Sequence, residues 1–304
     1  MKTNSTLLKT LRLIGHTDWI RRGVRERILR LFVNPDTADS YEFETDYFGM
    51  RYKGNLNRCI DWYVYFYGAY EKQLLLLARD LLQNRTNPIF IDVGANVGTY
   101  AIFLSKFCEE VHAFEPYDKA SDALRQNIEI NNIQNISVHN VALGARNCKL
   151  DLSVPKQSNL GTSSFVWLYG DGERITLRDI DVVTGDEVIK KINPEKIDLI
   201  KIDVEGFEKD ALIGLKKSLK AFYPIMLIEV SKGVFSNINE FDTALDGYEV
   251  YKVSYDTHRF VFFNTPSYCL SKFDFNSLKV QENILCLPKN SLSSIKNSGM
   301  PKFS

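Results

Sequence analysis

The chain has 304 residues, of which 44% are hydrophobic and 25% are charged, as is typical of a globular protein of one large domain or two small ones. Its 38 basic and 38 acidic residues cancel, so bulk charge gives no reason to expect a nucleic-acid partner. The five cysteines are scattered and include no C-x-x-C pair, which argues against a zinc site or a disulfide framework and favours a reducing compartment.

The first 33 residues place apolar side chains at helical spacing, and their eight bases outnumber two acids. We expect a solvated helix that packs on the main domain. The alternative is a basic amphipathic helix that makes peripheral contact with a membrane surface or an anionic glycolipid carrier. No apolar run approaches the roughly 20 residues that span a bilayer, and the N-terminus lacks the apolar core of a secretory signal. These features predict a cytoplasmic protein.

Residues 1–87 are expected to form an N-terminal extension and cap. Alternating aromatic and polar residues over 41–54 predict a short β-ribbon. The aromatic side chains from Trp62 to Tyr67 either pack the cap onto the core or line a ligand site. The segment Gly68–Glu71 then opens a helix that runs through Leu82.

From residue 88 to residue 288 the chain alternates strands and helices, which predicts a doubly wound sheet. An inserted hairpin is expected between 149–154 and 174–177, and its loop, 159–165, would border a site. Residues 289–304 predict a flexible tail. Core strands are expected over 89–93, 111–115, 136–142, 197–203, 224–230, 248–253 and 283–287, with a possible strand at 260–263 and helices over 118–132 and from Glu205–Glu208 to Leu219.

The turn after the first core strand begins the functional prediction. Asp92 ends the strand, and Gly94, Asn96 and Gly98 follow at every second position before a helix. Gly and Asn tolerate left-handed backbone angles and let a ligand approach the main chain, and amides at a helix start favour an anionic group. The spacing differs from the G-x-G-x-x-G of a nicotinamide site. Asp92 would repel a pyrophosphate but attract the ammonium of an amino-acid moiety.

Glu115 closes the next strand, 23 residues after Asp92. An acid at this place in a βαβ unit binds ribose hydroxyls, so the turn and Glu115 together predict an adenosine-type cofactor. The alternative is an ordinary turn with no ligand. Asp203 and Glu229 end two further strands, so four acids gather on the rim where a doubly wound sheet binds its ligands.

These residues resemble the FkbM family of S-adenosylmethionine-dependent methyltransferases over about residues 66–290. The resemblance implies an α/β class I methyltransferase fold, which is a Rossmann-like, seven-stranded, doubly wound sheet, here with an N-terminal helical and β-ribbon extension. The matching segments are Gly68–Glu71, Asp92–Gly98, Phe114–Pro116, Val141–Gly144, Ser163–Ser164, Ile197–Gly206 with Glu208, and Ile228–Val230.

The resemblance also implies S-adenosylmethionine as the cofactor. Main-chain amides of the 94–98 turn, with Asp92, would hold its methionine portion. Glu115 would bind both ribose hydroxyls, and Val141 and Ala142 would lie near the adenine. Asp203, at the end of the fourth strand, would face the cofactor.

Family members usually methylate a hydroxyl of a sugar, glycan or secondary metabolite, and this transfer needs a base or a metal to accept the hydroxyl proton. Asp203 is the first candidate for the general base. Glu229 and Glu205 would assist it or would bind a divalent cation with it, although no metal ligand is assigned. Glu208 better fits the first turn of a helix. His112 and His139 are expected to be structural, and the role of His258 stays open.

Two other classes stay open. A methyltransferase acting on protein, lipid or nucleic acid shares the cofactor core, but the chain has no Asn/Asp-Pro-Pro-Tyr/Phe signature and the core has no basic excess. A non-catalytic cofactor-binding module is the second alternative. We expect a small-molecule, glycan or glycolipid acceptor, with its contacts in residues 41–67, 156–172 and 232–282.

Overall fold

The computed structural model describes residues 5–17, 20–155, 165, 174–256, 267–278 and 280–290. The possible strand at 260–263, His258, Ser163–Ser164 and the tail beyond residue 290 lie outside these ranges. Within them, no helix has the length and apolar character needed to cross a membrane.

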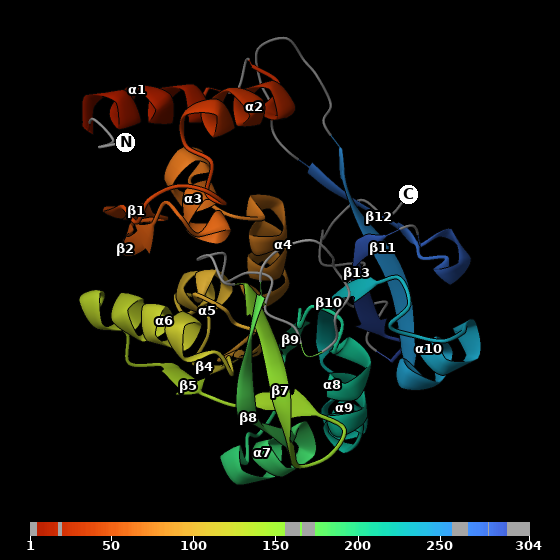
Figure 1. The fold of residues 1–304 in the computed structure, drawn as a ribbon. Coiled ribbons are helices and arrows are strands. Elements are labelled where there is room, and N and C mark those ends of the chain that lie inside the picture. Colours follow the sequence, from red (N-terminus) through yellow and green to blue (C-terminus); the bar gives the residue numbers. More distant parts are fainter. Residues whose placement is uncertain are drawn as a thin grey trace.

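An eight-stranded sheet forms the centre of the molecule (Figure 1), in the order β12-β11-β13-β10-β9-β3-β4-β5. The five strands from β5 to β10 pair in parallel, whereas β13 runs antiparallel between β10 and β11. Seven strands in this order, with this one reversed strand, are the predicted class I methyltransferase fold, and β12 adds an eighth at the edge. The strands are β3 Ile89–Val93, β4 Glu110–Phe114, β5 Ile136–His139, β9 Leu199–Ile202, β10 Ile225–Ser231, β11 Tyr248–Asp256, β12 Ser267–Lys272 and β13 Gln281–Pro288.

Helices cover both faces of the sheet, which explains why its central strands are continuously apolar. Successive residues of a strand point to opposite faces, so Phe90 packs with the α4 and α5 side and Ile91 packs with the α8 side. Leu215 separates two short helices where one continuous helix was expected. The helices of this part are α4 Lys72–Leu82, α5 Thr99–Leu104, α6 Asp118–Ile130, α7 Gly185–Ile192, α8 Glu208–Gly214, α9 Lys216–Phe222, α10 Ile238–Ala244 and the 3₁₀ turn Phe275–Ser277.

The N-terminal extension packs on the α4–α5 side of the sheet. Leu8, Leu11 and Leu29 are buried in the same apolar core as Phe90. The expected ribbon over 41–54 is present and pairs antiparallel. The elements of the extension are α1 Ser5–Gly15, α2 Arg22–Phe32, β1 Glu42–Tyr47, β2 Met50–Asn55 and α3 Cys59–Tyr67.

The predicted insertion forms a separate three-stranded sheet of β6 Ala142–Gly144, β7 Cys148–Pro155 and β8 Arg174–Thr184, with β7 and β8 antiparallel. The expected single strand over 136–142 was wrong, because the chain leaves the central sheet after His139. The Asn140 side chain donates a hydrogen bond to the Glu115 carbonyl oxygen at 2.9 Å. This bond fixes the chain at the point where it leaves the central sheet.

Candidate active site

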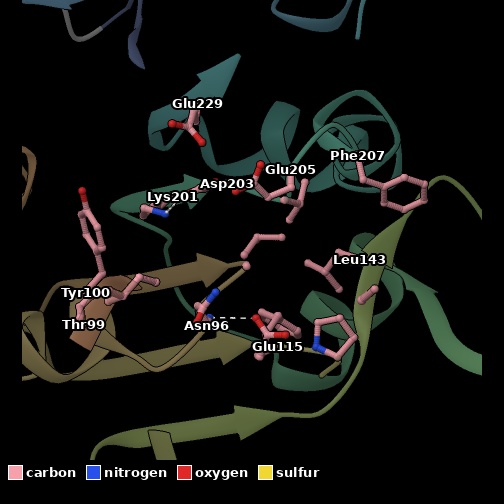
Figure 2. Close-up of a pocket in the computed structure, with 18 of the residues that line it drawn as sticks. Asn96, Thr99, Tyr100, Glu115, Leu143, Lys201, Asp203, Glu205, Phe207 and Glu229 are labelled. Atoms are coloured by element: carbon pink, nitrogen blue, oxygen red, sulfur yellow. Dashed lines mark hydrogen bonds and ion pairs between the residues drawn. The ribbon is translucent and has the colours of Figure 1, made fainter. Parts of the chain in front are cut away.

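A cavity lies at the carboxyl ends of the parallel strands, where strand ends, the insertion and the cap meet (Figure 2). Most of the predicted site residues line it, although they come from separate elements. Asp92 and Gly98 do not line it. The predicted residues that do are Gly94, Asn96, Glu115, Val141, Ala142, Asp203, Glu205 and Glu229.

The glycines of the turn serve close packing of the main chain. Gly94 has a φ of 83°, and a Cβ there would lie 1.8 Å from the Asp203 carbonyl oxygen, so the ends of β3 and β9 can touch only without a side chain. Gly98 has a φ of 85°, and its Cβ would lie 2.1 Å from Leu124 Cδ1 of α6. Gly98 therefore allows α5 to pack on α6, and its cofactor role stays a prediction.

The five amides of residues 94–98 all have acceptors within the chain. Gly94 and Ala95 both donate to the Phe114 carbonyl oxygen at 3.0 Å, and Asn96 donates to Glu115 Oε2 at 2.9 Å. Val97 donates to Asn96 Oδ1, and Gly98 donates to the Ala95 carbonyl oxygen. Each amide therefore holds the turn together in this conformation, and the contact of these amides with a ligand stays a prediction.

Glu115 joins the turn to the loop after β4. Its Oε2 accepts from the Asn96 amide and its Oε1 accepts from the Tyr117 amide, each at 2.9 Å. Burial raises the pKa of Glu115 to about 7, although these two hydrogen bonds favour the ionised form. Each carboxylate oxygen keeps a second lone pair for a further donor, so Glu115 is held in place with its acceptor capacity toward the cavity intact.

Asp92 lies beneath the turn and is 1% exposed. Burial raises its pKa to about 6, and the nearby Lys201 opposes this rise. Neither carboxylate oxygen accepts a hydrogen bond of normal geometry from the described residues. A buried carboxylate in this state needs a positive neighbour, and Lys201 supplies the nearest one.

Opposite Glu115, two carboxylates and one lysine form a charged cluster (Figure 2). Lys201 Nζ lies 2.8 Å from Asp203 Oδ2. Burial alone would raise the pKa of Asp203, but Lys201 and a hydrogen bond with Glu229 outweigh it and lower this pKa. Burial and the negative Asp203 raise the pKa of Glu229. These opposite shifts favour a pair that shares one proton, with the negative charge on the Asp203 side next to Lys201.

The sequence prediction missed Lys201, Glu71 and Tyr100, which line the same cavity. Tyr100 Oη donates to Glu71 Oε2 at 3.1 Å, and Lys201 Nζ lies 4.6 Å from the centre of the Tyr100 ring. Glu71 has a φ of 47°, an uncommon angle for a side chain of its size. Lys201 stands two residues before Asp203 on the same strand, so the alternation of strand side chains is a signal that could have found it.

Glu205 and Glu208 follow β9 in different roles. Glu205 has a φ of 50° and lines the cavity. Glu208 begins α8 as expected and accepts from the Gly206 amide at 2.9 Å, while burial raises its pKa to about 7.

One carboxylate oxygen from each of Asp203, Glu205 and Glu229 lies within 4.8 Å of the others. Three such oxygens are a ligand set that a hard divalent cation accepts.

The end of the cavity near Glu115 is apolar. Ala142, Leu143 and Leu152 come from the insertion, and Phe207 comes from the segment before α8. The Phe207 ring packs against Phe165 with their centres 5.1 Å apart. A flat, apolar ligand group next to a hydroxylated one would match this end of the cavity.

A comparison with protein families identifies the chain. The model described as the methyltransferase FkbM domain matches residues 92–251, which is more than half of the chain. The chain belongs to the FkbM methyltransferase family. It is therefore a methyltransferase, and its central sheet is the class I methyltransferase sheet of that family.

Curated relatives match about half of this chain. Methyltransferase 1 of Beauveria bassiana is 25% identical over 173 residues, which are 49% of this chain and 68% of the relative. The hexuronic acid methyltransferase AglP of Haloferax volcanii is 27% identical over 148 residues, which are 49% of this chain and 58% of the relative. Methyltransferase sdnD of Sordaria araneosa is 24% identical over 164 residues and is covered over 63% of its length.

Among solved structures, the methyltransferase FkbM from Methylobacillus flagellatus is similar to this chain with a TM-score of 0.40 and 17% identity. That alignment covers 92% of this FkbM-family chain and 58% of the solved one.

Proposed function

We propose that the protein transfers a methyl group from S-adenosylmethionine to a hydroxyl oxygen of a sugar, glycan or secondary metabolite. The observation that carries this proposal is the placement of Glu115 and the Asp203–Glu229 pair on opposite sides of one cavity. One side has the acceptors that a ribose needs, and the other has a carboxylate pair that can take a proton. Methyl transfer to a hydroxyl requires both.

The cavity residues fit this cofactor from end to end. Glu115 would accept hydrogen bonds from the two ribose hydroxyls, and the apolar end with Leu143 and Phe207 would hold the adenine. The buried carboxylate of Asp92 would favour a positive amino-acid group above the turn through its charge. When bound, S-adenosylmethionine supplies an electrophilic methyl group on a positively charged sulfur.

Asp203 is the proposed proton acceptor. Its ionised carboxylate would take the proton of the acceptor hydroxyl as the oxygen–methyl bond forms and the sulfur–methyl bond of the donor breaks, and the protonated Glu229 would stabilise its charge before the step. Lys201 holds Asp203 in position at 2.8 Å and keeps it ionised. Lys201 thereby provides the positive neighbour that a metal provides elsewhere, so we expect methyl transfer to continue in the presence of EDTA.

The acceptor side of the cavity is formed by the cap. Tyr70 and Glu71 line it from the N-terminal extension, and Gln281 lines it from β13. Aromatic, carboxylate and amide groups together recognise hydroxyl-rich molecules. One relative is named for hexuronic acid methylation, which supports a sugar acceptor. A nucleic-acid acceptor has no such support.

The test is release of S-adenosylhomocysteine from S-adenosylmethionine when glycan, lipid, tRNA or DNA fractions are supplied. We expect turnover with glycan or metabolite fractions, and a loss of at least a hundredfold in kcat for Asp203→Asn. The exposed Asp242→Asn of α10 is the matched control and should keep full activity. Calorimetric titration with S-adenosylhomocysteine, with NADH as the comparison, tests the cofactor separately. Cofactor binding with no turnover on any fraction would favour the non-catalytic binding module, and turnover on tRNA or DNA alone would overturn the acceptor class.

A further inference from the structure

Helix α2 presents its apolar side to solvent. Leu31, Phe32 and Val24 are 83%, 55% and 46% exposed, and Ile28 between them is half-buried. Their spacing of three, four and seven residues places all four on one face of the helix. A surface helix of a globular protein normally turns such a stripe toward the core, so the orientation of this stripe is inverted, while Leu29 on the opposite side of α2 is buried in the core.

Arginines on the other side of α2 explain the inversion. Arg25 is buried and donates to the Gly15 carbonyl oxygen at 2.6 Å. Guanidinium groups are weakly hydrated and stack well on aromatic rings, so they occupy the side of α2 that faces α3. The guanidinium groups of Arg22, Arg25 and Arg30 lie 5.3 to 5.7 Å from the ring centres of Trp62, Tyr63 and Tyr67.

Basic side chains border the outward stripe. Arg21 just before α2 and Arg27 on α2 are exposed, and Lys9 is exposed on α1 one turn from Leu13, which is 71% exposed. Figure 1 shows α1 and α2 on the outside of the molecule, with α3 between them and the sheet. Four of the nine large apolar side chains that are exposed in the described chain belong to these two helices. Over residues 5–33, excluding 18–19, there are seven bases and a single acid, Glu26, and three of the seven, Arg22, Arg25 and Arg30, are the ones stacked on α3.

We propose that the outer face of α2, formed by Arg21, Val24, Arg27, Leu31 and Phe32, docks on a lipid bilayer that contains anionic lipids. The apolar side chains would enter the boundary between headgroups and acyl chains, and the arginines would pair with anionic headgroups. Charge complementarity favours this occupant over a protein partner, because the positive charge is spread along both helices and needs an equally extended negative surface. The proposal concerns a face separate from the cavity and does not depend on the acceptor.

Co-sedimentation of the full chain with vesicles tests the proposal. One set contains phosphatidylcholine alone, and the other contains phosphatidylcholine mixed with phosphatidylglycerol. We expect partitioning onto the anionic set only, with loss at high salt because added ions screen the attraction. Leu31→Ser with Phe32→Ser should lower partitioning about tenfold through lost apolar burial, and Arg21→Gln with Arg27→Gln should lower it about tenfold through lost charge.

Matched control variants distinguish binding through this face from nonspecific adsorption to vesicles. Ile213→Ser with Val280→Ser removes two exposed apolar side chains elsewhere, and Lys190→Gln with Lys191→Gln removes two exposed bases of α7. Both control pairs should partition like the unchanged chain, and circular dichroism and S-adenosylhomocysteine binding report that every variant is folded. Equal partitioning onto neutral vesicles, or no partitioning of the full chain, overturns the proposal. If the Leu31 and Phe32 variant has a lower molar mass by light scattering but partitions like the unchanged chain, the face is a contact between copies of the protein. That result also overturns the membrane proposal.

Discussion

Glu115 is almost fully buried, and two main-chain amides position its carboxylate. Replacing it with Ala removes the proposed ribose contacts, each a charge-assisted hydrogen bond of about 1.5–3 kcal/mol. We expect affinity for S-adenosylhomocysteine to fall about tenfold to a hundredfold in calorimetric titration. Glu109→Ala, an exposed acid just before β4, is the control. Unchanged affinity in Glu115→Ala would refute the ribose assignment.

The pKa of Glu115 adds a pH dependence to this binding. Ribose hydroxyls donate to the ionised carboxylate, so binding requires the proton that Glu115 holds below a pH of about 7 to leave. Affinity for S-adenosylhomocysteine should therefore rise as the pH increases from 5.5 to 8 and level off above the pKa. Glu115→Gln cannot titrate and should bind weakly with a flatter pH profile. Calorimetric titration in two buffers of different ionisation enthalpy measures the proton released on binding. An affinity for S-adenosylhomocysteine that falls as the pH rises would contradict the assignment of Glu115 to the ribose.

In the proposed mechanism, Lys201 acts on the reaction through Asp203. Without the ammonium group, burial would raise the pKa of Asp203, and the base would become ionised only at higher pH. For Lys201→Met we expect the acid limb of the kcat/KM profile to move to higher pH, with kcat at neutral pH reduced at least tenfold. Lys201→Arg keeps the charge and should restore much of the profile. An unshifted acid limb in a folded Lys201→Met enzyme would remove Lys201 from this role.

At the scale of elements, the contact of α5 with α6 depends on the absence of a side chain at Gly98. Gly98→Ala adds a Cβ 2.1 Å from Leu124 Cδ1 and strains a φ of 85°. We expect a loss of about 2–4 kcal/mol in the free energy of unfolding, measured with urea. Gly233→Ala is the matched control, since Gly233 has a φ of 93° and no atom within 4 Å of the added Cβ.

Leu124→Ala tests the same contact from the other helix. Alone it should cost about 2–5 kcal/mol, but combined with Gly98→Ala it removes the colliding atoms. The double variant should therefore lose less stability than the sum of the two single variants. An additive result would show that the strained φ, and not the clash, accounts for the cost of Gly98→Ala.

The turn, Glu115 and the strand-end acids could be predicted from local sequence patterns, because each pattern involves only a few neighbouring residues. Their placement at one site then follows from the rule that a doubly wound sheet binds its ligands at the carboxyl ends of its strands. Lys201 was equally local and was overlooked. Glu71 and Tyr100 were beyond prediction from sequence, because their proximity to Lys201 depends on how the cap docks on the strand ends. The orientation of the α2 arginines toward α3 could not be predicted for a related reason. Stacking of these arginines on the α3 aromatic rings competes with burial of the apolar side chains of α2, and the outcome depends on the tertiary structure.

The molecule as a whole contains several buried acids whose pKa burial raises, among them Asp92 to about 6 and Glu115 and Glu208 to about 7. A raised folded-state pKa means that the folded chain holds protons that the unfolded chain has released. The resulting stability is complete below a pH of about 4 and is lost as the pH rises through 6 to 7. His139, with a pKa lowered by burial to about 4, works in the opposite direction over this interval, whereas the lowered pKa values of Asp203, Glu44 and Glu240 act at more acidic pH.

The ligand-free protein should therefore melt at a lower temperature at pH 7.5 than at pH 5.5, as measured by calorimetry. Saturating S-adenosylhomocysteine should reduce the difference between the melting temperatures at pH 5.5 and pH 7.5, because it stabilises the ionised form of Glu115. The Glu115→Gln variant should show a smaller difference between these two melting temperatures even without ligand. A melting temperature that rises steadily over this interval would show that the buried acids do not dominate the pH response.

The walls of the cavity have a consequence for how substrate choice can change among relatives. Tyr70 and Glu71 precede residues 92–251, which the FkbM family model matches, and Gln281 follows them, whereas Gly94, Glu115 and Asp203 lie within them. Under the proposed function, the cofactor and the acceptor are contacted by different stretches of chain. Substitution at Tyr70, Glu71 and Gln281 is then expected to change the acceptor while the methyl-donor site stays the same, so specificity can diverge at the periphery of the cavity without a change in the chemistry.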